Sequence, residues 1–141
     1  MTNGILVNPD LSTRPVTVDD SQLAELLGGG STEYISVSFD EGKEGLVAIV
    51  NSAPTAGLEE PNAFASLGKN HANTGNSAFF TDPTSAIFGP VIVVSGTVDA
   101  ISDITEAGQE QVEEGIRATA NYREDYPQEF QLWHNAAKNL G

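Results

Sequence analysis

The sequence predicts an α+β fold, with a mostly antiparallel sheet of about four or five strands, helices packed on one side of it, and an extra helix at the C-terminus. Two observations carry this prediction. As far as residue 94, short runs of apolar and β-branched residues are separated by turn-forming residues, which is typical of strands. Beyond residue 99, apolar residues recur at spacings of three and four, which is the spacing along one face of a helix.

Residues 5–18 predict an N-terminal β-hairpin. Asn8, Pro9 and Asp10 separate its two β-prone runs. They favour a turn because proline fixes φ and the other two side chains bond to their own backbone. Pro15 has no amide hydrogen to donate, so the second run is expected at a sheet edge or at the start of a strand.

A short helix is predicted next. Asp19 or Asp20 is a suitable N-cap for it, and Leu23 and Leu27 share one apolar face. The three glycines at 28–30 end this helix, because glycine readily adopts the left-handed conformation found after a helix C-terminus. They do not join a strand to a helix start, so they do not indicate a phosphate-binding loop.

Three more strands are expected in the middle of the chain. Residues 34–39 alternate, with the odd-numbered apolar residues on one face. Residues 46–50 are continuously apolar, so we expect a central strand that is covered on both faces. Residues 87–94 form the next apolar run, and its Gly-Pro pair at 89–90 indicates a bulge or an edge near the strand start.

The long segment 51–82 is predicted to be mostly irregular, with one helical turn at 62–67. A loop of this length in a compact domain is either functional or mobile. Its amides and its histidine could hold a polar ligand; the alternative is a plain surface loop. The candidate ligand-binding residues are Asn62, Asn70, His71, Asn73 and Asn76.

The C-terminal third predicts two helices. Asp103 or Thr105 is expected to cap the first helix, and Pro127 starts the second one at its first helical position. An apolar stripe that includes Phe130 and Trp133 runs along the second helix. This stripe is expected in the core, or otherwise as a ridge that docks on a second copy or on a partner.

The first of these helices is rich in acidic residues. It is interpreted either as a solvated helix face or as a surface that contacts a basic partner. The candidate partner-binding residues are Asp103, Glu106, Glu110, Glu113 and Glu114.

Charge is the strongest global feature of the chain, which has 141 residues, 20 of them acidic and six basic, and a formal net charge of −14. Phosphate contacts require basic residues, so direct binding to nucleic acid or to an anionic membrane is not expected. No apolar run approaches the roughly 20 residues that span a bilayer. No signal peptide is recognised either, so we expect a cytoplasmic protein of a single domain.

No catalytic, cofactor-binding or metal-binding residues are predicted. The chain has no cysteine, which excludes disulfides and cysteine-ligated zinc. His71 and His134 have no other ligand at a local metal-binding spacing. Acidic pairs are too common in this sequence to indicate general acid and base catalysis, so an enzyme is not expected.

Four motifs occur in a suggestive order. They are the hairpin, a short helix that ends in glycines before a Tyr-Ile strand, a Pro-Asn-x-x-Ala segment at 61–65, and an Ile-x-Gly-Pro-x-x-Val-Val strand at 87–94. The order resembles a family of small uncharacterised proteins of phages, prophages and plasmids, defined only as a domain of unknown function. The likeness covers about residues 4–118, and residues 119–141 are an added helical extension. It implies an accessory protein of a mobile element in a bacterial or archaeal cytoplasm, and no catalytic residues.

The leading hypothesis is therefore a non-enzymatic accessory protein that binds a host or element protein through acidic surface. A partner that itself binds nucleic acid is one form of this hypothesis, because an acidic surface can imitate a polyanion. One alternative is a protein that binds or sequesters a small ligand with the 51–82 segment. Another is that the acidity only reflects a saline host. A homodimer is compatible with all three.

Overall fold

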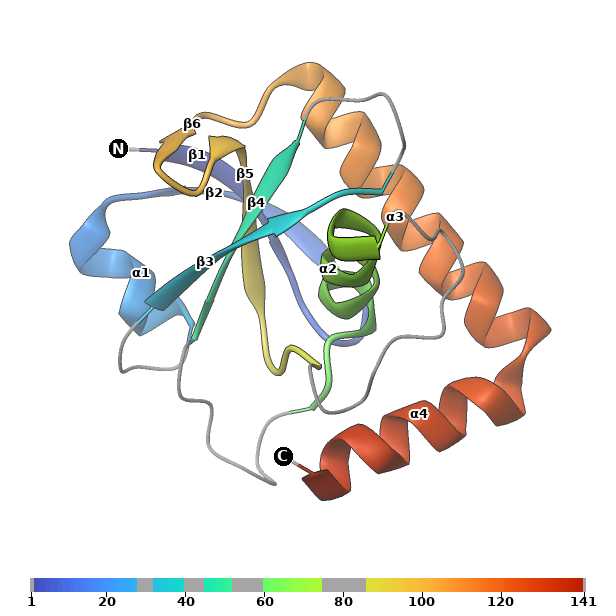
Figure 1. The fold of residues 1–141 in the computed structure, drawn as a ribbon. Helices are drawn as coiled ribbons and strands as arrows, with labels where there is room; N and C mark the ends of the chain where they lie inside the picture. Colours follow the sequence, from blue (N-terminus) through green and yellow to red (C-terminus); the bar gives the residue numbers. More distant parts are fainter. Residues whose placement is uncertain (1, 28–31, 40–44, 52–59, 75–85, 141) are drawn as a thin grey trace.

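The computed structural model describes residues 2–27, 32–39, 45–51, 60–74 and 86–140, which form one six-stranded antiparallel sheet and the helices around it. The strands are β1 (Thr2–Val7), β2 (Thr13–Val18), β3 (Thr32–Val37), β4 (Leu46–Asn51), β5 (Val91–Thr97) and β6 (Ala100–Ser102). The helices are α1 (Asp20–Leu26), α2 (Ala63–Thr74), α3 (Glu106–Asp125) and α4 (Pro127–Leu140). The strand order is β2-β1-β5-β4-β3, and β6 pairs with the end of β5 (Figure 1).

The predicted α+β class, the antiparallel sheet and the extra C-terminal helix are confirmed. The structure adds that the two faces of the sheet carry different helices. Phe64 of α2 and Val112 of α3 pack on one face, whereas Leu23 of α1 and the adjoining Leu27 pack on the other. The expectation that helices pack on one side of the sheet therefore holds for α2 and α3. α1 differs from it, because it covers the opposite face.

The N-terminal hairpin is confirmed, with Val7 opposite Thr13. Its turn is closed by backbone hydrogen bonds, and Leu11 adopts a φ of 72° there. β2 lies at one end of the strand order, as its proline predicted. Pro15 is tolerated there because an edge strand pairs on one side only.

The central strand is also confirmed. β4 lies between β3 and β5, and Ala48 is paired with Ile35 on one side and Val93 on the other. Its residues from Leu46 to Val50 are all buried, and they alternate between the two hydrophobic clusters on the two faces. A strand covered on both faces needs apolar residues at every position, which explains the unbroken run.

The prediction of a strand over 87–94 is wrong in its start, because β5 begins at Val91. Gly89 has a φ of 76° and Pro90 cannot donate a hydrogen bond, so regular pairing begins only after them. β5 then continues past the expected end to Thr97, and the chain turns back at residues 98–99 into β6. The short strand β6 was not predicted.

The prediction of an irregular 51–82 segment is also wrong in part, because α2 is a helix of 12 residues. Asn62 begins it: its Oδ1 accepts a hydrogen bond from the Ala65 amide (3.0 Å). Its Nδ2 donates to the carbonyl oxygens of Val7 (3.2 Å) and Gly89 (2.9 Å). The side chain is fully buried, so it joins the helix to β1 and to the chain entering β5.

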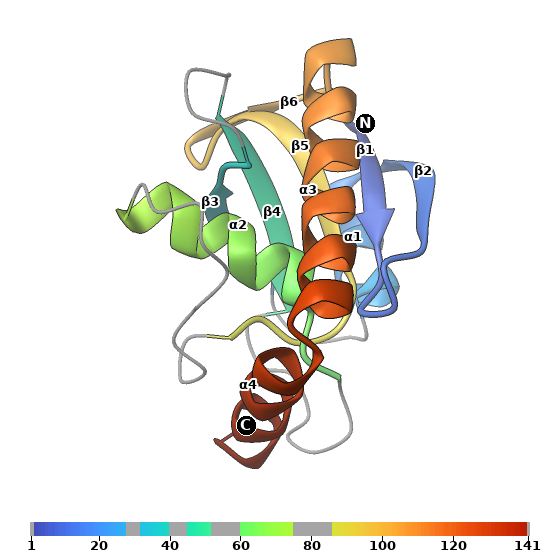
Figure 2. The same ribbon diagram turned by 90° about the vertical axis from the view of Figure 1, so that its right-hand side faces the viewer.

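The C-terminal helices begin where the sequence predicted. Thr105 caps α3 by accepting a hydrogen bond from the Gly108 amide (2.9 Å), and α4 begins at Pro127. Trp133 packs with Ala63 and Leu67 of α2, so the predicted apolar stripe belongs to the core. α4 turns back beneath the rest of the fold (Figure 2). Residue 119, where the expected C-terminal extension begins, lies inside α3, and α4 follows as the last described helix.

Candidate functional site

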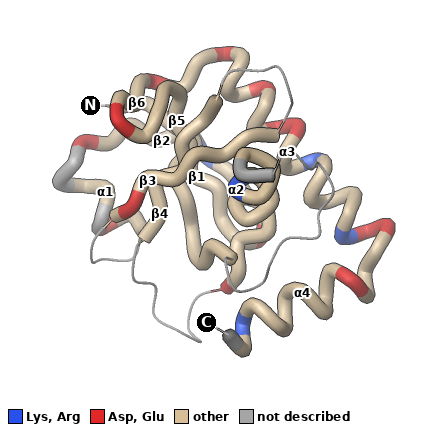
Figure 3. The backbone as a smooth tube through the Cα atoms, viewed as in Figure 1, with Lys and Arg blue, Asp and Glu red and all other residues tan. Residues whose placement is uncertain are grey.

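The five predicted partner-binding residues all lie exposed on α3 or directly before it. We call this set the acidic face: Asp103, Glu106, Glu110, Glu113 and Glu114. Residues three and four apart on a helix are neighbours on its surface, so the four glutamates form one continuous stripe. Acidic positions gather on the first half of α3 in the backbone view (Figure 3).

The opposite side of α3 is held closely against the core. Gly115 shows this: a Cβ added there would lie 2.5 Å from the Phe39 ring and 2.8 Å from the Phe64 ring. Those two rings are stacked with their centroids 4.4 Å apart, so neither can yield easily. Thr119 and Val112 are also buried on this side. The acidic face is therefore fixed outward.

The acidic face is not neutralised within the described part of the chain. The ion pairs found there join Glu60 to His134 and to Lys138, far from this surface. Arg117 lies on the same helix side, four residues after Glu113, and it is the only base among residues 103–117. Uncompensated carboxylates on one rigid face produce a local negative potential that attracts cationic groups.

The predicted ligand-binding residues that the structure describes lie at the start of α2 and along it. Asn62 is a buried structural residue, as described above. Asn70, His71 and Asn73 belong to α2. His71 comes eight residues after the first residue of this helix, which places it about 12 Å along the helix axis. Asn76 lies outside the described residues, as do the glycines at 28–30. The four described residues of the predicted site are therefore one buried helix cap and three positions along α2.

His71 lines a small cavity of about 100 Å³ together with residues of α2, α3 and the end of β3. The side chain is 7% exposed, and its Nδ1 has no hydrogen-bond partner among the described residues. Apart from Ser38, the other residues around this cavity are apolar or glycine: Phe39, Leu67, Gly115 and Ala118. A space of this size holds about three water molecules and not a metabolite. In the described residues, no three metal-ligating side chains converge on one point.

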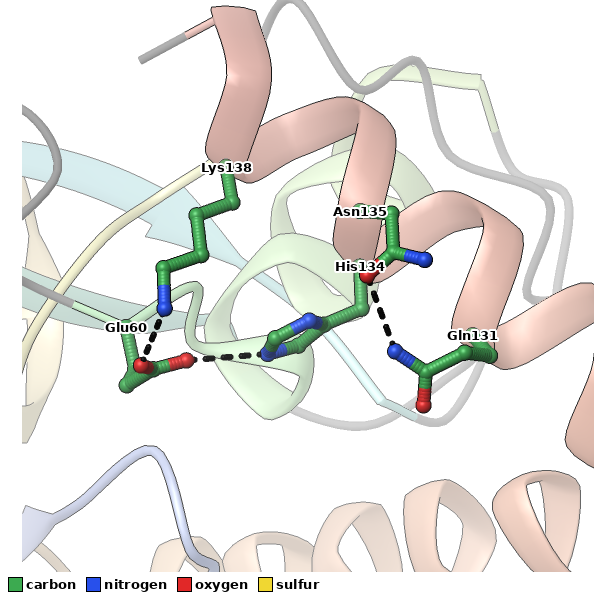
Figure 4. Close-up of polar contacts among 5 residues, drawn as sticks. All are labelled: Glu60, Gln131, His134, Asn135 and Lys138. Atoms are coloured by element: carbon green, nitrogen blue, oxygen red, sulfur yellow. Dashed lines mark hydrogen bonds and ion pairs between the residues drawn. The ribbon is translucent and has the colours of Figure 1, made fainter.

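A second polar cluster joins α4 to the segment before α2 (Figure 4). Glu60 accepts a hydrogen bond from Lys138 Nζ at 2.8 Å, and its other oxygen lies 3.0 Å from His134 Nε2. The hydrogen bond from Lys138 lowers the pKa of the Glu60 carboxyl, and the charges of Lys138 and His134 add to this effect. The cluster was not predicted from the sequence, although the spacing of four between His134 and Lys138 is a sign of a shared helix face.

Glu60 and His134 also line an open groove of about 550 Å³. The groove lies between the turn of the N-terminal hairpin, the segment before α2, the end of α3 and the first turns of α4. Its remaining lining residues are Asn8, Pro9, Asp10, Pro61, Arg123, Phe130 and Gln131. A volume in this range is typical of small-molecule sites.

Comparison of the chain with protein-family models, with curated proteins and with solved structures gave no match. The resemblance to a phage and plasmid family therefore stays a prediction from sequence motifs. Among the described residues, no helix is both long enough and apolar enough to cross a membrane.

Proposed function

We propose that this is a non-enzymatic binding protein whose acidic face docks on a basic surface of another protein. The observation that carries the proposal is the exposure of five carboxylates on and before one helix whose opposite side is packed against the core. A rigid surface loses little conformational entropy on binding, so it favours docking over wrapping. In line with the family resemblance, the partner is a protein of a mobile element or of its host, and a protein that binds nucleic acid fits best.

The physical basis is electrostatic steering. A net charge of −14 produces a long-range field, and clustered carboxylates focus it on one face. Complementary charges mainly raise the rate of association and exclude wrong partners. Because the Debye length is about 10 Å at 0.1 M salt and about 3 Å at 1 M, such binding weakens as salt is added.

The test compares two variants of equal charge. The first replaces the four glutamates of the acidic face with glutamine (E106Q, E110Q, E113Q and E114Q). The control replaces four exposed glutamates elsewhere with glutamine: Glu25, Glu33, Glu124 and Glu129. Each protein is immobilised and exposed to the same lysate at low and at high salt, and the captured proteins are identified by mass spectrometry.

We expect one protein that is captured by the wild type and the control at low salt, released at high salt, and not captured by the acidic-face variant. Equal capture by the two variants would remove the acidic face as the site. No salt-sensitive capture by the wild type would instead favour acidity as an adaptation to a saline interior.

A further inference from the structure

The groove beside α4 is chemically unlike the rest of this acidic protein. Two of the six basic residues, Arg123 and Lys138, lie at the groove or directly beside it, together with His134. Glu60 already pairs with Lys138 and His134, so these three groups largely satisfy one another. The charges left for a ligand are those of Asp10 and Arg123.

Arg123 is exposed in the last turn of α3 and forms no ion pair among the described residues. A guanidinium presents a planar set of donors that matches the two oxygens of a carboxylate. The net charge of −14 repels free anions from most of the surface, so a purely anionic ligand is a poor fit for the molecule as a whole.

Asp10 supplies the opposite charge from the hairpin turn. Its Oδ1 accepts hydrogen bonds from the Ser12 hydroxyl (2.6 Å) and from the Ser12 amide (2.9 Å). These bonds lower the pKa of the Asp10 carboxyl, so it is ionised at neutral pH. Asp10 forms no ion pair within the described residues, so its carboxylate can accept a hydrogen bond from an ammonium group.

The groove also has an apolar wall. Pro9 and Pro61 line it from the hairpin turn and from the segment before α2, and Phe130 lines it from α4. Phe130 is partly buried against Trp133, with ring centroids 6.1 Å apart, which fixes its ring in place. An apolar group on a ligand would contact rigid rings there, which favours binding.

We propose that this groove binds a small zwitterion, which is either an apolar amino acid or a short apolar peptide. Its carboxylate would pair with Arg123 and its ammonium group with Asp10. The volume of about 550 Å³ accommodates either source of this chemistry. The site is separate from the acidic face, so it can exist whether or not the proposed protein partner does.

The test is a ligand titration of the isotope-labelled full chain, monitored by the NMR chemical shifts of its backbone amides. The probes are L-phenylalanine, the dipeptide Leu-Phe, phenylacetate as the anion alone and phenethylamine as the cation alone. We expect saturable shifts at Asn8, Gln131 and His134 with one or both zwitterions. Each single-charge probe should bind with an affinity about tenfold lower. The stronger of the two zwitterions identifies the source.

Two substitutions locate the site. R123Q and D10N are each expected to weaken zwitterion binding about tenfold, because each removes one charge-assisted hydrogen bond. R117Q and D99N are the matched controls, since they remove the same charges at exposed positions outside the groove. The controls should change the affinity less than twofold.

Absence of saturable shifts at the groove with all four probes at millimolar concentration would overturn the proposal. Unchanged zwitterion affinity in both R123Q and D10N would overturn it as well. A thermal unfolding curve for each variant shows whether it is folded, and R123Q on an exposed helix position remains informative if D10N disturbs the hairpin turn. Neither outcome bears on lysate capture by the acidic face.

Discussion

Lys138 near the C-terminal end of α4 donates a hydrogen bond of 2.8 Å to Glu60, which lies 78 residues earlier in the chain. With His134 at 3.0 Å from the other oxygen of the same carboxylate, the contact ties α4 to the segment that leads into α2. Among the described residues, α4 is held to the rest of the fold by this cluster and by its buried residues Trp133 and Ala137.

The Glu60 contact predicts a pH-dependent stability. The folded-state pKa of Glu60 is lowered, so the ion pair stabilises the fold above the ordinary pKa of glutamate, and that stabilisation is lost as pH falls through the folded-state pKa. E60Q should therefore lower the Tm slightly at pH 7, and the difference from wild type should vanish in acid. Thermal unfolding between pH 7 and pH 3 measures this. E124Q is the control, and an equal Tm decrease in it would show that total charge is the cause.

Trp133 is expected to be the main anchor of α4. It is 7% exposed and packs against Ala63, Leu67 and Phe130. W133A should lower the free energy of unfolding by about 3 kcal/mol, because truncating a large buried aromatic side chain to alanine typically costs this much. Amide exchange should rise in α4 first and leave β4 protected. L132A, at a residue that is 69% exposed, should change the free energy by less than about 0.5 kcal/mol. Similar losses in the two variants would contradict the docking of α4.

Gly115 tests how closely α3 is seated. The methyl group of G115A would lie 2.5 Å from Phe39, and overpacking of this kind costs about 1–3 kcal/mol. The better helix propensity of alanine offsets about 1 kcal/mol of this loss. We expect a net decrease in the denaturation midpoint. G45A, where a Cβ meets no atom within 4 Å, should leave the midpoint nearly unchanged. A G115A variant as stable as wild type would mean that α3 can move away from the core.

Asn62 should be less tolerant of aspartate than of alanine. N62A removes the helix cap and the side-chain donor to two buried carbonyl oxygens, for a loss of roughly 3 kcal/mol. N62D keeps the cap, but at neutral pH it places a buried carboxylate against the carbonyl oxygens of Val7 and Gly89. Urea unfolding at pH 7 should rank wild type above N62A, and N62A above N62D. The reverse order of the two variants would show that the capping bond is the dominant one. N121A, on the exposed side of α3, is the control.

The acidic face should reduce stability at low salt. Glu106 and Glu110 are four residues apart, as are Glu110 and Glu114, and each such like-charge pair costs about 0.2–0.5 kcal/mol. The variant with four glutamines should therefore be at least as stable as wild type at low salt and gain less from added salt. Urea midpoints at the two salt concentrations measure this. A loss of stability in the variant would show that these carboxylates support the fold and are not available for a partner.

Local chemistry was enough to predict several elements. Pro15 placed β2 at an edge, the unbroken apolar run placed β4 at the centre, and Thr105 and Pro127 marked the starts of α3 and α4. Each of these signals acts through the backbone of its own residue or through burial on both faces. Such constraints are readable without knowledge of the tertiary contacts.

The elements that were missed depend on tertiary contacts. α2 contains the poor helix formers Gly68, Asn70 and Asn73. The burial of Phe64 and Leu67 against the rest of the protein compensates for their low helix propensity. β6 has only three residues, too few for a periodic pattern. The groove takes its residues from four separate segments, and Glu60 is 74 residues from His134, so no local spacing could indicate it.

Pro15 has a further effect on how these molecules behave in a crowded solution. An outer strand is a template on which another chain can add, because it carries a row of unused backbone donors and acceptors. A proline within that row removes one donor and leaves a gap that an incoming strand cannot match. The exposed edge of β2 thus resists edge-to-edge pairing between the sheets of two molecules.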